Sequence, residues 1–103
     1  MCGICGVLSF RQTEINLAAM ANEMIDSLDH RGPDGRGIYT DSSGVGFGHA
    51  RLSIIDLSDL GKQPMQSRCS RYVISYNGEI YNYRSLSAEL QRKGSQLLSL
   101  IHI

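Results

Sequence analysis

The sequence predicts a small α+β domain. The chain has 103 residues, 42% of them apolar, which suits a single globular domain. The spacing of the apolar residues changes along the chain, in the order strand, helix, several strands and a final helix. This order indicates mixed α+β layering rather than a regular βαβ series.

The first two elements are a strand and a helix. A buried strand is expected at residues 3–10, where the residues are apolar and rich in bulky or β-branched types. From Asn16 onward the apolar residues recur at steps of three and four, which predicts an amphipathic helix of about three turns. The residues of this stripe are Leu17, Met20, Ala21, Met24, Ile25 and Leu28. Thr13 and Asn16 are the candidate N-caps.

A hairpin is expected after the helix, with strands at 37–40 and 45–51 joined by a turn at 41–44. Gly32 precedes Pro33 and must therefore be extended, which ends the helix before this point. Small residues share one side of the second strand: Gly44, Gly46, Gly48 and Ala50. Such a bare face favours close approach by another backbone or by a ligand.

The second half of the chain predicts four further segments. An apolar run at 52–57 is followed by a loop at 58–64 and by a strand at 72–76, which Asn77-Gly78 stops. A final helix is expected from about Tyr83 to Lys93.

Charge and hydropathy exclude several classes of function. Ten basic residues balance ten acidic ones, so no net field directs the chain to nucleic acid or to an anionic membrane. The first residues lack the basic and apolar regions of a signal peptide. No stretch approaches the roughly 20 apolar residues that a membrane-spanning helix needs. A soluble, cytoplasmic protein is therefore expected, without nucleic-acid or membrane partners.

Cys2 is the first residue with a chemical role to consider. Removal of Met1 would place a thiol and a free α-amine on one residue, and such an amine can accept a proton near neutrality. Nucleophile and base would then belong to a single amino acid. A small buried apolar residue is the simpler interpretation when this position is taken alone.

The three cysteines also allow a metal-binding interpretation. Cys2 and Cys5 form a CxxC pair, and Cys69 is the third thiol. Zinc sites usually need four ligands, and the sequence has no second CxxC or paired histidines, so no metal site is expected. A small zinc module using these thiols remains an alternative, which the zinc stoichiometry would test.

Five blocks in a fixed order carry a family resemblance. They are Met1-Cys2-Gly3-Ile4, His30-Arg31-Gly32-Pro33-Asp34, Arg51-Leu52-Ser53-Ile54-Ile55-Asp56, Gln63-Pro64-Met65, and Tyr76-Asn77-Gly78-Glu79-Ile80-Tyr81-Asn82-Tyr83. From Met1 to about Gly94 the chain resembles the glutaminase domain of asparagine synthetases, a class II glutamine amidotransferase. The resemblance implies an N-terminal-nucleophile (Ntn) fold, with two packed antiparallel sheets between helices (αββα). It also implies that the Cys2 thiolate attacks the side-chain amide of glutamine, releasing ammonia and then glutamate.

The resemblance gives roles to further residues. Asn77 and Gly78 would form the oxyanion hole, from a side-chain amide and a backbone N–H that no Cβ obstructs; a plain Asn-Gly turn is the other interpretation. Arg51 would hold the α-carboxylate of glutamine, because its planar fork suits a bidentate partner. Glu79 would meet the ammonium group of the substrate. The segment that would line the pocket comprises Leu52, Ser53, Ile54 and Ile55.

The loop that begins at His30 is expected to shape the pocket. His30 is not needed as a base, because the terminal amine already supplies one. Arg31 and Asp34 are expected to hold this loop through ion pairs or backbone hydrogen bonds.

The resemblance ends near Gly94. Residues 1–94 are predicted to be a partial amidotransferase domain, and residues 95–103 a divergent tail that leaves the fold incomplete at its C-terminal side. The family's second domain, which uses ATP and Mg to activate aspartate and receives the ammonia, is expected as a missing partner, and the full-length protein as a possible homodimer. The chain itself contains no phosphate-binding loop, so no cofactor is expected in this segment. Alone, it is expected to have little activity.

Two other functions remain open. The ammonia acceptor could be an acid other than aspartate, as in asparagine-synthetase-like amidotransferases. Alternatively, the chain could be a non-catalytic form of the fold. Retention of Met1, visible in the intact mass, would favour this second alternative.

Overall fold

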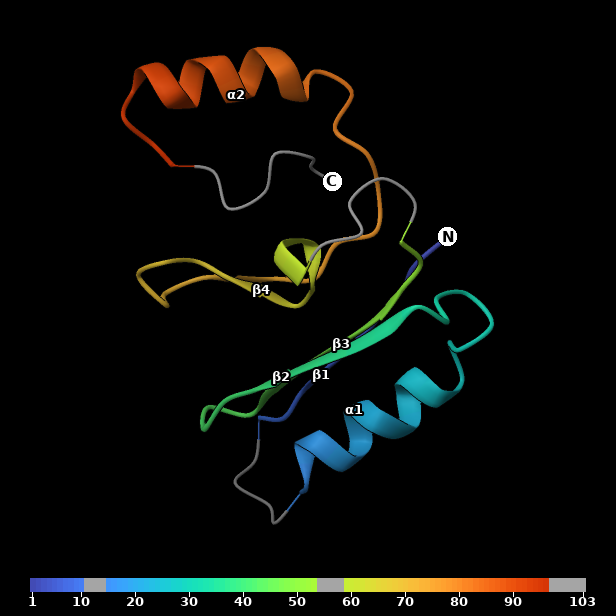
Figure 1. Ribbon diagram of the computed structural model, residues 1–103. Helices are drawn as coiled ribbons and strands as arrows, with labels where there is room; N and C mark the ends of the chain where they lie inside the picture. Colours follow the sequence, from blue (N-terminus) through green and yellow to red (C-terminus); the bar gives the residue numbers. More distant parts are fainter. Residues whose placement is uncertain (11–14, 54–58, 97–103) are drawn as a thin grey trace.

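In the computed structural model, residues 1–10, 15–53 and 59–96 are described, and they form two antiparallel sheets and two helices (Figure 1). In chain order the elements are β1 (Gly3–Leu8), α1 (Leu17–Asp26), β2 (Gly35–Thr40), β3 (Val45–Arg51), a 3₁₀ turn (Asp59–Gly61), β4 (Met65–Gln66), β5 (Val73–Ile74) and α2 (Tyr83–Arg92). The predicted α+β class is confirmed. None of these helices is long and apolar enough to cross a membrane.

The larger sheet has the strand order β1-β3-β2, with both pairs antiparallel. In this register Gly3 lies opposite Ala50, so the start of β1 meets the end of β3. The predicted hairpin between β2 and β3 is confirmed, although β2 begins earlier than expected, at Gly35. Its turn is held by the Asp41 carboxylate, which accepts hydrogen bonds from the backbone N–H groups of Ser43 (2.9 Å) and Val45 (3.2 Å).

Helix α1 covers one face of this sheet (Figure 1). Of the two candidate caps, Asn16 is the one that caps it, since its side chain accepts a hydrogen bond from the Ala19 N–H at 3.0 Å. Ile25 is fully buried against β3. A Cβ atom added to Gly48 would lie only 2.7 Å from Ile25 Cδ1, so the bare side of β3 exists because the helix packs closely there.

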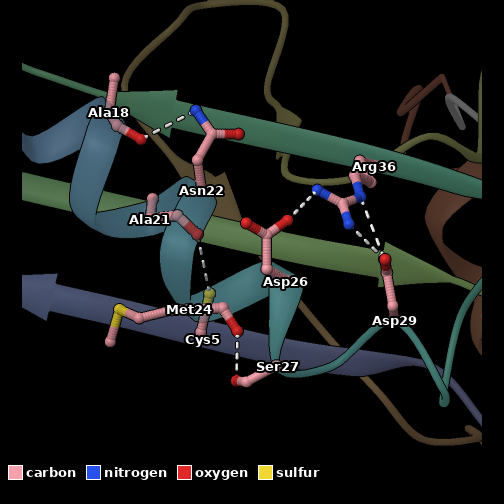
Figure 2. Close-up of polar contacts among 9 residues, drawn as sticks. All are labelled: Cys5, Ala18, Ala21, Asn22, Met24, Asp26, Ser27, Asp29 and Arg36. Carbon is pink, nitrogen blue, oxygen red and sulfur yellow. Dashed lines mark hydrogen bonds and ion pairs between the residues drawn. The ribbon is translucent and has the colours of Figure 1, made fainter.

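Polar contacts join α1 to the sheet at two places (Figure 2). Arg36 on β2 forms ion pairs with Asp26, the last residue of α1, and with Asp29 in the turn that follows, with N···O distances of 2.5 Å to each carboxylate. In the middle of the helix, the Cys5 thiol of β1 donates to the Ala21 carbonyl at 3.9 Å. Both β1 and β2 are therefore tied to α1 directly.

The opposite face of the sheet is covered by the segments before β4 and after β5 (Figure 1). A Cβ atom on Gly37 would collide with the Gln63 carbonyl, which shows how closely the first segment approaches. In the second segment, the Ser75 hydroxyl donates to the Gly48 carbonyl at 3.4 Å. This face carries the contacts that build the candidate site.

Two further predicted boundaries were wrong. The first strand ends at Leu8 rather than residue 10, with Ser9 bonded to the Gly44 carbonyl in the adjoining turn. The strand predicted at 72–76 is only Val73–Ile74, because the next two residues bond to β3 and to the Gln63 side chain instead of to a neighbouring strand. The final helix is confirmed, with Lys93 as its C-cap, and all of its side chains are at least partly exposed. Most of the predicted run at 52–57, including Ile54 and Ile55, lies outside the described residues.

Candidate functional site

Cys2 lies at the junction between the start of β1 and the end of β3. Its half-buried sulfur accepts a hydrogen bond from the Leu52 N–H at 3.3 Å and lies 3.6 Å from the Leu52 carbonyl, to which the thiol donates. These residues are 50 positions apart and meet because β1 and β3 are antiparallel neighbours. A negatively charged sulfur would accept this hydrogen bond more strongly than a neutral sulfur would.

The carbonyl group of Cys2 receives two side chains from other segments. Asn77 Nδ2 donates to it at 2.8 Å, and Arg31 Nε donates at 3.2 Å. Four of the five sequence blocks therefore meet at Cys2: the N-terminus, the 30–34 loop, the end of β3 and the segment after β5. Asn77 is exposed, so its side chain is held near Cys2 by this hydrogen bond rather than by burial.

The loop at residues 30–34 packs against the end of β3. The Asp34 N–H donates to the Arg51 carbonyl at 2.9 Å, and the Asp34 carboxylate accepts from the Ser53 N–H at 2.8 Å. A Cβ atom on Gly32 would collide with the Ala50 carbonyl, so only glycine permits this approach. Arg31 and Asp34 thus hold the loop through backbone hydrogen bonds, as predicted.

Arg51 is the last residue of β3 and is half-buried. Since side chains alternate along a strand, it shares with His49 the face that points away from α1. The two side chains are near enough for the positive charge of Arg51 to contribute to the lowering of the His49 pKa. Arg51 therefore lies on the same side of the sheet as the segment that carries Asn77.

The remaining predicted site residues follow Asn77 or Arg51 in the chain. Gly78 and Glu79 are exposed, next to Asn77. A Cβ atom on Gly78 would lie 2.5 Å from the Tyr76 hydroxyl, so a larger residue would push against that ring. The structure places Cys2 in direct contact with Leu52 and Asn77. Arg51 and Ser53 are linked to these residues through the 30–34 loop.

Two site-forming residues, His49 and Gln63, were missed by the sequence reasoning. They are the buried polar side chains of the described part of the chain, with exposures of 1% and 8%. Both bond to the backbone of Tyr76, the residue before Asn77. Burial is the main cause that lowers the pKa of His49, and the nearby Arg51 charge adds to it, while the bond to Tyr76 opposes both. A histidine on the inward face of a glycine-rich strand was the available signal.

The three thiols have different surroundings. The Cys5 sulfur faces α1, and burial raises its pKa. Cys69 is exposed, and a hydrogen bond with the Ser67 hydroxyl is the main cause that lowers its pKa. In residues 1–10, 15–53 and 59–96, no three His, Cys, Asp or Glu side chains are grouped so that they could hold a metal ion. Of the three thiol residues, Cys2 is the one whose described hydrogen bonds reach the other sequence blocks of the site.

Comparison with known proteins finds relatives that are named as glutamine-hydrolysing asparagine synthetases. Asparagine synthetase 1 (glutamine-hydrolyzing) of Bacillus subtilis (strain 168) is 44% identical over 98 residues, covering 91% of this chain and 15% of that protein. Asparagine synthetase B (glutamine-hydrolyzing) of Escherichia coli (strain K12) is 39% identical over 89 residues, with 86% and 16% covered. Amidase chry2 of Gibberella zeae is 41% identical over 100 residues, with 87% and 12% covered.

The chain thus spans less than a fifth of the length of these curated relatives. Residues 1–100 match the family described as "Glutamine amidotransferase domain". The match extends past Gly94, and the domain boundary predicted there stays a prediction. The matched residues cover nearly the whole chain, and the chain belongs to the glutamine amidotransferase domain family.

Proposed function

We propose that the chain is the glutamine-hydrolysing part of an amidotransferase, with Cys2 as its nucleophile once Met1 has been removed. The observation that supports this most strongly is the meeting of Cys2 with Asn77 and Leu52 at one point of the fold. Met1 is 73% exposed, so nothing in the fold shields it from removal.

The proposed reaction has two steps. The Cys2 sulfur attacks the carboxamide carbon of glutamine, and its proton passes to the freed α-amine of the same residue. The carbon–nitrogen bond then breaks, and the amine returns the proton to the departing nitrogen. Ammonia is released, and a γ-glutamyl thioester remains on Cys2. Water then attacks the thioester, giving glutamate and the free thiol.

Asn77 and Gly78 are the proposed donors to the negative oxygen that forms in both steps. A side-chain amide has two N–H bonds, and Asn77 uses one of them for the Cys2 carbonyl. The second N–H is available for an oxygen that forms on the carbon bonded to Cys2. Removal of one such donor typically costs about 10²–10³ in kcat.

The proposed substrate contacts lie on either side of Cys2. Arg51 would bind the α-carboxylate of glutamine, and Glu79 its ammonium group. The backbone of residues 52–55 would line the pocket between them. Arg51 lies on the same side of the sheet as the segment that carries Asn77, which supports this proposal.

The layers of the fold fit an Ntn architecture. One sheet carries α1 on its outer face, and the β4–β5 pair lies on its other side. We infer that these are the first parts of the αββα arrangement of that class. A cytoplasmic location fits the same class of enzyme.

For the ammonia acceptor, we propose aspartate, activated by ATP in a synthetase domain outside this chain. The support is that several relatives bear the name asparagine synthetase and are several times longer than the region matched. The similarity to amidase chry2 keeps a different acceptor as the second candidate.

The test follows the amide nitrogen of glutamine. The purified chain is incubated with glutamine labelled with ¹⁵N in its side chain, and labelled ammonia and glutamate are quantified. We expect equal amounts of the two products, their loss in Cys2→Ser, and unchanged release in Cys69→Ser, since Cys69 lies outside the site. Release by Cys2→Ser, or none by the folded wild-type chain, would overturn the proposal.

A second preparation tests the amine. An N-terminal extension that a protease removes directly before Cys2 keeps the amine in a peptide bond until cleavage. Ammonia release should appear only after cleavage. Equal release before and after it would exclude the terminal amine as the base.

A further inference from the structure

The peptide groups on both sides of Tyr76 are bonded to buried side chains. Gln63 Oε1 accepts from the Tyr76 N–H at 2.6 Å, and His49 Nε2 lies 3.3 Å from the Tyr76 carbonyl oxygen. His49 comes from β3, and Gln63 comes from the segment before β4. Tyr76 lies after the end of β5. Within the described residues no neighbouring strand pairs with its backbone, and these two side chains bond to it instead.

The bond to Tyr76 fixes the protonation of His49. A carbonyl oxygen can only accept, so Nε2 carries the proton and donates it, and in the neutral ring Nδ1 is then bare. Within the described residues, Nδ1 is buried and has no hydrogen-bond partner. Burial of a polar atom without a partner is unfavourable. An apolar side chain would avoid that cost but would leave the Tyr76 carbonyl without its donor, so the Nε2 donor is what a polar side chain supplies at this position.

The residue after Tyr76 is Asn77, whose amide meets Cys2. The side chain of Asn77 is exposed, and so is Gly78 beyond it, so packing contributes little to their placement. The position of the Asn77 backbone therefore depends on the fixed peptide groups of Tyr76. The Ser75 hydroxyl, bonded to the Gly48 carbonyl at 3.4 Å, adds a third anchor one residue earlier.

We propose that His49 and Gln63 are positioning residues, which hold the Tyr76 backbone so that the Asn77 amide points at Cys2. The inference rests on the proposed function, because it assigns these residues to the oxyanion donor of that reaction. Neither side chain contacts the reacting atoms. They act through Asn77, and their loss would displace a donor without removing a substrate contact.

The first test compares two substitutions of His49. Glutamine places an N–H donor near the position of Nε2, whereas methionine has similar bulk and no donor. His49→Met should lower kcat by about 10- to 100-fold with little change in KM, since a misplaced catalytic group costs about that much. His49→Gln should restore most of kcat. Wild-type kinetics in His49→Met would overturn the inference.

The second test asks whether the effect passes through Asn77. In an Asn77→Ala background the donor is already absent, so adding His49→Met should change kcat by no more than about twofold. Gln63→Met should behave in the same way. A full additional loss in the double variants would show that His49 and Gln63 act independently of Asn77 and would overturn the inference.

A third measurement does not depend on activity or on the folding of variants. Nitrogen NMR of the ¹⁵N-labelled wild-type chain should show the His49 ring protonated at Nε2 and the Tyr76 amide protected from hydrogen exchange. A proton at Nδ1, or a rapidly exchanging Tyr76 amide, would overturn this inference but not the proposed function. By contrast, activity that survives Cys2→Ser would overturn the proposed function and leave this geometry in place.

Discussion

The described contacts of Cys2 come from one backbone segment, one side-chain amide and one guanidinium group. Its sulfur meets the Leu52 backbone, and its carbonyl receives Asn77 and Arg31. Such contacts orient a small nucleophile without crowding it. Arg51, the last residue of β3, is the charged residue that we propose for recognition of the substrate.

At this scale Arg51→Lys tests substrate recognition. Lysine keeps the charge but cannot form two parallel hydrogen bonds with a carboxylate. The loss of one charged hydrogen bond, worth about 1.5–3 kcal/mol, should raise KM for glutamine roughly 10- to 150-fold with a smaller change in kcat. Steady-state kinetics check this, with the exposed Arg71→Lys as the control. An unchanged KM would remove Arg51 from the substrate site.

The order of the sequence blocks predicted Cys2 and Asn77 as site residues, and the structure brings the two into contact. The order could not identify their partners. Leu52 is 50 positions from Cys2, and His49 is 27 positions from Tyr76, so their contacts depend on the register of the sheet. A single sequence without a fold does not specify that register. The roles of Gly78 and Glu79 remain predictions.

Between elements, α1 packs closely against β3. The small residues of β3 allow Ile25 and the Cys5 sulfur to reach the strand backbone. The same strand pairs with β1 in the register that brings Cys2 to Leu52. The helix–sheet contact and the site are therefore coupled through β3.

Gly48→Ala tests this coupling. The added Cβ would lie 2.5 Å from the Cys5 sulfur and 2.7 Å from Ile25 Cδ1, so α1 must shift. Overpacking of this kind typically costs about 1–3 kcal/mol. Urea unfolding should show that loss for Gly48→Ala. It should show almost none for Gly35→Ala, where the nearest atom, Arg51 Cβ, is 3.8 Å away in ordinary contact. Equal stability of the two variants would contradict the packing.

The helices and the hairpin were predictable from the sequence because each has a local signal. The 3–4 spacing and the Asn16 cap identified α1, and the turn at 41–44 identified the hairpin. The strand predicted at 72–76 was too long, because its last residues bond to side chains from elsewhere. Apolar alternation alone cannot distinguish such a segment from a paired strand.

Over the whole molecule, His49 links stability to pH. Burial lowers its pKa in the folded state below the ordinary value of 6.5, so the unfolded chain binds more protons on acidification. The contribution of His49 to the free energy of unfolding should therefore be constant above about pH 6.5 and fall below it.

This pH dependence can be isolated by mutation. His49→Gln should flatten the decrease between about pH 6.5 and 4.5, whereas the exposed His30→Gln should retain it. Asp41, whose pKa is lowered mainly by Ser43, acts below its ordinary value of 3.8 and so outside this range. Urea titrations at several pH values provide the measurement. An unaltered slope in His49→Gln would mean that His49 does not titrate on unfolding.

Several large apolar side chains of the described residues are exposed, among them Leu8, Phe10, Tyr72 and Ile74. Exposed apolar side chains contribute little to stability. We therefore expect the isolated chain to hydrolyse glutamine more slowly than the E. coli asparagine synthetase B. The central claim is that Cys2 is the nucleophile. It needs a measurement that gives a clear result even when turnover is slow.

Covalent capture of Cys2 is such a measurement. A glutamine analogue with a diazoketone in place of the side-chain amide loses N₂ when a thiol attacks it, leaving a stable thioether. After incubation, peptide mass spectrometry locates the label. The account predicts a single label on a peptide whose first residue is Cys2, prevented by excess glutamine. Labelling of Cys5 or Cys69 instead, or labelling that glutamine does not prevent, would contradict it.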